Sequence, residues 1–416
     1  MGRLLALAWL GVLVACNARP GDAPDAAASP QASVVPAPLA LATTMPSALP
    51  ASMPEGGPPP VPLRGDVALG PDSVREPVDE KPRGERAAGY TLSALFRPAD
   101  VVLPPRAPEV NTAGLDAARK KTELRVAIDV TPSRMRLALI GTGFVLPEET
   151  EIRSRADRYG HVVVWPGGAT YRPLAPGAMR ALLGERRFDL SPIATANVAE
   201  KEEVGKRIGI RARKVEVSTR VAKATLEVGR VQDLGEGGVL LCRLLFDLMN
   251  APPPTAACGL DELPLRAELR WNTLGSFTFE VTGILRRTEL GFASLSVPPV
   301  GAQFSLAPPP SRGAAPMLTA AELAAFRTTP IDMPPGPFAN ADGLIVTNAT
   351  DQLRILYIDG IPVLWASAGA KDVLKGLPRG RYVSQWRTFL GEAIEPPESQ
   401  AVPGVATVGN PDAGAR

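Results

Sequence analysis

Residues 124–139 read LRVAIDVTPSRMRLAL and decide the fold of the first folded part of the chain. Apolar side chains alternate with polar or small ones over 124–128 and again over 134–139, which is the period of a strand with one buried face. Residues 131–133, Thr-Pro-Ser, separate the two runs and are typical of a turn. We therefore predict an antiparallel hairpin within a mostly antiparallel β structure.

Further runs with the same alternation follow along the chain, and turn residues such as Gly160 separate them. Each of these runs predicts a strand: 151–155, 161–165, 214–219, 222–228, 265–271, 276–281 and 293–297. Arg286 and Arg287 indicate a charged turn between the last two runs.

Two stretches predict helices. Residues 178–183 fit a short helix that Gly184 ends, and residues 239–249 fit a longer one whose only charges are Arg243 and Asp247. Because the longer helix is apolar on almost every side, we expect it to be buried against the sheet. Residues 89–306 are therefore predicted to form one α+β domain, mostly antiparallel, with one buried helix.

Residues 235–238, Gly-Glu-Gly-Gly, precede this helix and invite comparison with nucleotide-binding loops. The third glycine of a dinucleotide fingerprint would fall at Leu240, and no Walker lysine follows. The glycines are therefore interpreted as a flexible entry to the helix, and no cofactor is predicted.

The last part of the chain begins with proline-rich segments. Residues 307–338 are predicted to be a linker that holds one short helix, whose start Thr319 and Glu322 mark as a capping box. Four runs beyond it fit strands: 344–347, 353–358, 361–365 and 381–387. Residues 405–416 are expected to be a frayed tail.

Residues 355–360 and 374–383 resemble the PEGA-like family of small bacterial β-sandwich modules. The first segment, Ile-Leu-Tyr-Ile-Asp-Gly, ends in a tight hairpin turn at Asp359 and Gly360. The second reads Leu-Lys-Gly-Leu-Pro-Arg-Gly-Arg-Tyr-Val, whereas the Pro-Glu-Gly-Ala signature of the family is absent. The resemblance implies a β-sandwich module over 339–404 that serves extracytoplasmic packing or adhesion, and it brings no catalytic residue.

The chain begins with Arg3 and an apolar run over 4–14 that is too short to span a bilayer but fits a signal peptide. The run ends in Leu-Val-Ala-Cys at 13–16, which resembles the lipobox of bacterial lipoproteins. The resemblance implies that a signal peptide over 1–15 is removed and that Cys16 carries the lipid that anchors the protein to a membrane. An ordinary cleaved signal is the alternative. Asn17 follows in place of the aspartate associated with inner-membrane retention, so the outer membrane is favoured.

Residues 16–88 contain no aromatic side chain after the cysteine and are rich in Ala and Pro. Such a segment cannot bury enough apolar area to offset the entropy of ordering it, so we predict a disordered tether. The prolines at 58–62 could instead be a docking ligand, although a plain spacer is the simpler interpretation.

The charge balance and the residue inventory exclude several classes of function. The 45 basic and 43 acidic residues give a net charge of +2 without any basic arm, so no nucleic-acid partner is expected. His161 is the only histidine, at the start of a predicted strand where a structural role is favoured. There is no Gly-x-Ser-x-Gly elbow and no Ser-x-x-Lys pair, so no catalytic residue and no metal site is predicted.

Carboxylate chemistry stays open, because the two acids of a glycoside hydrolase need no fixed spacing in the sequence. Asp261 and Glu262 are adjacent, would point to opposite faces of a strand and are interpreted as solvated loop charges. Tyr382 and Trp386 would share one strand face and are candidate binding residues for a sugar, with core packing as the favoured alternative.

Cys242 and Cys258 are predicted to form a disulfide. Export places them in a compartment that permits disulfides, and lipidation would consume Cys16. The prolines at 252–254 turn the chain back between the two cysteines. Two unpaired thiols, one of them buried, are the alternative.

These observations predict a lipid-anchored protein of the cell envelope that is a non-enzymatic binding or structural module. The expected partners are the membrane, through the lipid, and an envelope protein or a cell-wall polysaccharide. The alternative is a hydrolase of cell-wall polymer that uses paired carboxylates.

Overall fold

The computed structural model describes residues 86–98, 123–141, 146–158, 160–175, 177–182, 197–251, 255–306, 313–326, 337–338 and 342–409. The expected signal peptide, Cys16 and nearly all of the expected tether lie outside these ranges. Within them, no helix is both long and apolar enough to cross a membrane.

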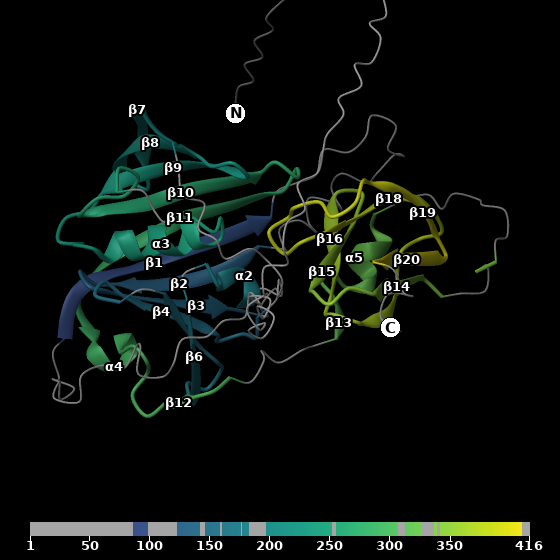
Figure 1. The fold of residues 1–416 in the computed structure, drawn as a ribbon, viewed down its shortest axis with the longest axis horizontal. Helices are drawn as coiled ribbons and strands as arrows, with labels where there is room; N and C mark the ends of the chain where they lie inside the picture. Colours follow the sequence, from purple (N-terminus) through teal and green to yellow (C-terminus); the bar gives the residue numbers. More distant parts are fainter. Residues whose placement is uncertain are drawn as a thin grey trace, which may run out of the picture. The chain divides into compact units, whose positions relative to one another are not determined.

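Twelve of the described strands form one sheet, in the order β12-β6-β5-β4-β3-β2-β1-β11-β10-β9-β8-β7 (Figure 1). All neighbouring pairs are antiparallel except β12 with β6. The strands are β1 (Arg86–Pro98), β2 (Leu124–Val130), β3 (Arg134–Ile140), β4 (Glu151–Arg155), β5 (His161–Val164), β6 (Thr170–Leu174), β7 (Asn197–Arg207), β8 (Ile210–Ser218), β9 (Ala222–Arg230), β10 (Glu262–Trp271), β11 (Ser276–Gly291) and β12 (Gln303–Phe304).

The predicted hairpin at 124–139 is confirmed as β2 and β3, with Ile128 opposite Leu137. Their apolar side chains are buried on one face, and the side chains between them are only partly buried or exposed on the other. β1 pairs with β2 on one side and with β11 on the other, and thereby joins the two halves of the sheet.

The helix α3 (Gly237–Asp247) covers the apolar face of the sheet, and most of its side chains are buried. The glycines at its start allow a very close approach. A Cβ on Gly237 would overlap the carbonyl oxygen of Thr131, and a Cβ on Gly238 would overlap that of Glu262. Tight packing against the backbone, and not flexibility, is therefore what these glycines provide.

The predicted disulfide between Cys242 and Cys258 is present and ties α3 to the loop before β10, with the two Cα atoms 6.5 Å apart. The predicted short helix is α2 (Met179–Leu182). Asp247, in the last turn of α3, accepts hydrogen bonds from the backbone N–H groups of Gly177 and Met179, which fixes α2 against α3.

Two sequence predictions in this part are wrong. Residues 293–297 do not form a strand, because α4 (Phe292–Leu295) begins where Gly291 ends β11, and Leu295 is buried. The expected charged turn is also absent, because β11 continues through Arg286 and Arg287, opposite Tyr90 and Gly89 of β1. Tyr90 and Arg286 are almost two hundred residues apart in the sequence. Pairing between such distant strands overrides the tendency of two adjacent arginines to lie in a turn.

Two smaller sheets follow, a five-stranded one in the order β13-β16-β15-β18-β19 and a three-stranded one in the order β17-β14-β20. Leu356 and Val363 of the first belong to the same apolar core as Val346 and Val408 of the second. The elements are β13 (Ala314–Pro316), α5 (Ala320–Ala324), β14 (Leu344–Asn348), β15 (Arg354–Ile358), β16 (Ile361–Ala366), β17 (Lys371–Leu374), β18 (Gly380–Arg387), β19 (Glu398–Val402) and β20 (Gly404–Val408).

The local signals of the C-terminal sequence are confirmed. Asp359 and Gly360 have φ values of 47° and 81° and connect β15 to β16, as a two-residue hairpin turn requires. Thr319 and Glu322 form a capping box at the start of α5.

Two boundaries differ from the sequence prediction. The expected linker contains β13, which pairs with β16, and Phe326, which is fully buried in the C-terminal core. The expected tail is wrong for residues 405–408, which form most of β20 and pair in parallel with β14. Val408 is buried there, so burial of alternate side chains holds this segment in place.

The five-stranded sheet also contacts the loop between β10 and β11. Arg387 is 2% exposed and donates hydrogen bonds to the carbonyl oxygens of Leu274, at 3.1 Å, and Gly391, at 2.7 Å. The rings of Phe277 and Phe389 lie 6.0 Å apart. A buried guanidinium bonded to carbonyl oxygens thus holds this contact.

Candidate functional site

The face of the sheet opposite α3 is polar across β7 to β11. On β9, Lys223, Thr225 and Glu227 alternate with side chains that are buried in the core, as the pleat of a strand requires. On β10, Arg266 and Glu268 do the same. One face of the sheet therefore packs in the core, and the other face contacts solvent.

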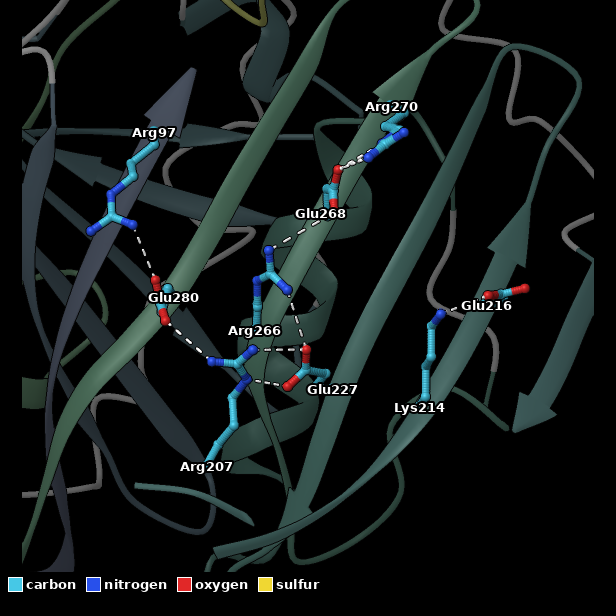
Figure 2. A network of polar contacts seen from close by, with 9 residues as sticks. All are labelled: Arg97, Arg207, Lys214, Glu216, Glu227, Arg266, Glu268, Arg270 and Glu280. Atoms are coloured by element: carbon cyan, nitrogen blue, oxygen red, sulfur yellow. Dashed lines mark hydrogen bonds and ion pairs between the residues drawn. The ribbon is translucent and has the colours of Figure 1, made fainter. Parts of the chain in front are cut away.

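A chain of ion pairs runs across this face, and Figure 2 shows α3 behind it, on the other side of the strands. Arg97 contacts Glu280 at 3.2 Å, and Glu280 contacts Arg207 at 3.3 Å. The remaining links join Arg207 to Glu227, Glu227 to Arg266, Arg266 to Glu268 and Glu268 to Arg270.

Arg207 reveals how the edge of the sheet is bent. Neighbouring strands are about 4.8 Å apart, so two strands separated by three others lie roughly 19 Å apart in a flat sheet. β7 and β11 are separated in this way, yet Arg207 at the end of β7 contacts Glu280 of β11. The β7–β8 hairpin must therefore curl over the polar face. Register shifts in β7 between Lys201 and Gly205 are bulges, which bend a strand in this manner.

The curled hairpin encloses a hollow of about 600 Å³ above β8, β9 and β10. Polar and charged side chains dominate its lining. They are Asn197, Lys214, Glu216, Ser218, Lys223, Thr225, Glu227, Arg266, Glu268 and Arg270. We call this hollow the polar groove.

Strand register arranges the polar groove in three rows, because residues opposite each other on antiparallel strands share a face. The charged row consists of Lys214, Glu227, Arg266 and Glu280. The middle row consists of Glu216, Thr225, Glu268 and Thr278. The donor row consists of Asn197, Ser218, Lys223 and Arg270. Thr278 and Glu280 belong to these rows but lie beyond the lining of the groove.

Glu227 is the most enclosed acid of the groove, with 10% of its side chain exposed. Burial alone would raise the pKa of Glu227, but the hydrogen bonds and charges of Arg207 and Arg266 outweigh burial and hold the pKa below its usual range. This carboxylate therefore stays ionised at neutral pH.

The aromatic candidate site is not on the surface. Tyr382 and Trp386 are 1% and 4% exposed and belong to the C-terminal core, and the Tyr382 hydroxyl donates to the carbonyl oxygen of Pro378. Neither ring has an open face for a sugar.

Asp261 and Glu262 are half-buried and bonded, which differs from the expected solvated charges. Asp261 accepts a hydrogen bond from the Gly235 N–H at 2.7 Å, and Glu262 pairs with Arg213 at 2.7 Å. Both carboxylates thus hold the backbone around the start of α3 and β10.

His161 lies inside the protein. Its Nδ1 is 2.8 Å from Ser154 Oγ, and both residues are 1% exposed. Burial, with a smaller contribution from the charge of Arg243, lowers the pKa of His161 to about 3. A substrate has no access to this Ser–His pair, which supports the structural interpretation of His161. Within the described ranges, no cluster of three His, Cys, Asp or Glu side chains could hold a metal ion.

Few local features of the sequence predict the polar groove. β7 carries mostly charged residues without clear alternation, and its pairing with β8 was not predicted. Ile208 and Gly209, both with positive φ, form the two-residue turn between β7 and β8, and this turn is the best local indication of the hairpin. The charged residues of β9 and β10 alternate as expected, but only the register places them in rows.

No family model matches the chain, and no curated protein matches it. Among solved structures, two of PNGF-II, in space groups C2 and P21, are similar to part of it with a TM-score of 0.27 and 10% sequence identity. The match covers 53% of this chain and 31% of PNGF-II, so this chain spans less than a third of that protein. A similarity of this size indicates neither fold nor activity.

Proposed function

We propose that this protein is a lipid-anchored binding protein of the cell envelope and that the polar groove holds its ligand. The observation that carries the proposal is the bent β7–β8 hairpin, which encloses a lined space over an otherwise open sheet face. Concave sites with a few placed polar groups are where ligands usually bind. Delivery to the outer membrane through lipidated Cys16 rests on the lipobox resemblance.

The ionisation and the pairing of the acids in the groove favour ligand binding over hydrolysis. A glycoside hydrolase needs one protonated carboxyl group as general acid, which requires a raised pKa. The pKa of Glu227 is lowered, Glu268 contacts the guanidinium groups of Arg266 and Arg270, and Glu216 pairs with Lys214 at 3.0 Å. Glu227 therefore does not suit proton donation, and because all three acids are paired with cations, the groove suits recognition of a polar ligand.

The C-terminal sheets are assigned the role of an accessory module. Their shared apolar core supports a β-sandwich arrangement, as the PEGA-like resemblance of residues 355–360 and 374–383 implies. In this proposal they serve packing or adhesion in the envelope while the groove binds the ligand.

A bulky side chain placed in the polar groove tests whether the ligand binds there. Thr225 stands on its floor, and Thr278 occupies the same row on β11, outside the lining. Trp is compatible with strands, so Thr225→Trp and Thr278→Trp should both fold. Because the lipid alone would hold the protein in the envelope fraction, all three proteins carry Cys16→Ala. We expect Cys16→Ala by itself and Cys16→Ala with Thr278→Trp to sediment with insoluble envelope material, and Cys16→Ala with Thr225→Trp to stay in the supernatant. Equal sedimentation of all three proteins would reject the groove as the binding site.

The anchor is tested separately. Cys16→Ala should abolish incorporation of labelled fatty acid and release the protein from the membrane fraction. Equal labelling of the substituted protein would contradict lipidation at this cysteine.

A further inference from the structure

The donor row forms one end of the polar groove. Asn197, Ser218, Lys223 and Arg270 come from four consecutive strands, β7 to β10, and all four line the hollow. Each of these side chains can donate a hydrogen bond, and none carries negative charge. Arg207 lies at the other end of β7, so the donor row is at the opposite end of the hairpin from the contacts of Arg207 with Glu227 and Glu280.

Two cations stand side by side in this row. Lys223 on β9 is directly opposite Arg270 on β10, which places their Cβ atoms roughly 5 Å apart. Like charges in this position repel and destabilise a sheet. Arg270 is partly compensated because its Nε donates to Glu268 at 2.6 Å. Among the described residues, Lys223 is exposed and has no acidic partner.

An anion that lies between the two cations would offset their mutual repulsion. The Ser218 hydroxyl and the Asn197 amide, on the other side of Lys223, extend the row of donors toward the hairpin. Hydrogen bonds from charged donors to oxyanions are about twice as strong as neutral ones. A ligand group with several oxygen acceptors matches this arrangement of donors.

We propose that the donor row is an oxyanion subsite, which binds a carboxylate or phosphate group of the ligand through Lys223 and Arg270, with Ser218 and Asn197 as further donors. The assignment deepens the proposed function and rests on the polar groove as the binding site. The middle row lies two residues along each strand from the donor row and carries Glu216 and Glu268. These carboxylates would repel a second anionic group of the ligand. The ligand therefore presents one anionic group at this end and neutral or cationic groups along the groove.

The subsite is tested by calorimetric titration of the full-length protein with two probes, an N-acetylated neutral tripeptide with one free carboxylate and inorganic phosphate. Lys223→Gln should weaken binding about tenfold, since it removes one charged hydrogen bond to the anion. Lys223→Arg should restore it. The matched control is Lys375→Gln, which removes the same charge from an exposed lysine of the C-terminal part, where it pairs with Asp342. Lys223→Gln should not lower the melting temperature, because it relieves a repulsion.

Binding that is weakened by Lys223→Gln and unchanged by Lys375→Gln supports the subsite, and the tighter probe shows whether carboxylate or phosphate is preferred. Absence of binding by the unsubstituted protein, or equal weakening by both substitutions, overturns it. A failure of the oxyanion subsite can be distinguished from a failure of the proposed function. If Thr225→Trp blocks sedimentation with envelope material while Lys223→Gln leaves both titrations unchanged, the groove binds its ligand without an oxyanion subsite.

Discussion

Arg207 Nη1 lies 3.3 Å from Glu280 Oε1, although three strands separate β7 from β11 in the sheet. Arg207 also contacts Glu227 on β9. One side chain at the turn of an edge hairpin therefore contacts acids on β9 and β11, which holds that hairpin over the polar face.

Arg207→Gln should loosen the β7–β8 hairpin, because it removes the contacts to Glu227 and Glu280. Global stability should change by less than about 1 kcal/mol, since the pairs are partly exposed. Amide hydrogen exchange should accelerate in β7 and β8 and stay unchanged in β10. Arg286→Gln is the matched control, because it breaks an exposed pair with Asp233 without involving the hairpin. Unchanged exchange in β7 and β8 would show that Arg207 does not hold the groove closed.

Replacing both Cys242 and Cys258 by serine should lower the free energy of unfolding by about 3 kcal/mol, because the bridge spans a sequence separation of 16 and restricts the unfolded chain. Denaturant unfolding with and without reductant measures this difference. Reductant should destabilise the unsubstituted protein and leave the double variant unaffected. Equal sensitivity of the two proteins to reductant would contradict a structural role for the bridge.

Asp247 should make stability fall as the pH rises. Burial raises the pKa of Asp247 to about 6, against the opposing hydrogen bonds from Gly177 and Met179. The folded state therefore binds the proton more tightly than the unfolded state, whose pKa is the ordinary 3.8. The group's contribution is most favourable below about pH 4 and is lost by about pH 6 to 7, a change of roughly 3 kcal/mol.

Asp247→Asn isolates this contribution from the other titrating groups. At pH 4 the protonated carboxyl group and asparagine each offer one carbonyl oxygen to the two N–H donors, so the two proteins should be about equally stable there. The stability of the unsubstituted protein relative to Asp247→Asn, measured by urea unfolding, should fall between pH 4 and pH 7. A constant difference over that range would show that Asp247 titrates normally.

The parts of the fold that depend on local patterns were predictable. Alternation over 124–139, the apolar face of 239–249 and the two-residue turn at Asp359 and Gly360 all act within a few residues, and all were confirmed. The disulfide was also predictable, because export permits disulfides and the sequence offers Cys242 and Cys258 as the two cysteines that remain after Cys16.

The groove could not be predicted, because it depends on contacts between distant strands. Lys223 and Arg270 become neighbours only through the register of β9 with β10. The continuation of β11 through Arg286 likewise depends on pairing with β1, which local charge does not reveal. Sequence alternation showed which side chains face solvent, but not which strands lie side by side or how the edge bends.

Photo-crosslinking inside the groove tests the central claim most directly. A photoreactive amino acid is placed at Thr225 or at Thr278 of the full-length protein, and intact cells are irradiated. The two positions share a row and a residue type, and only Thr225 lines the hollow. Binding in the polar groove predicts that an envelope component becomes linked at Thr225 and not at Thr278. Adducts at Thr278 alone, or equal adducts at both positions, would contradict it.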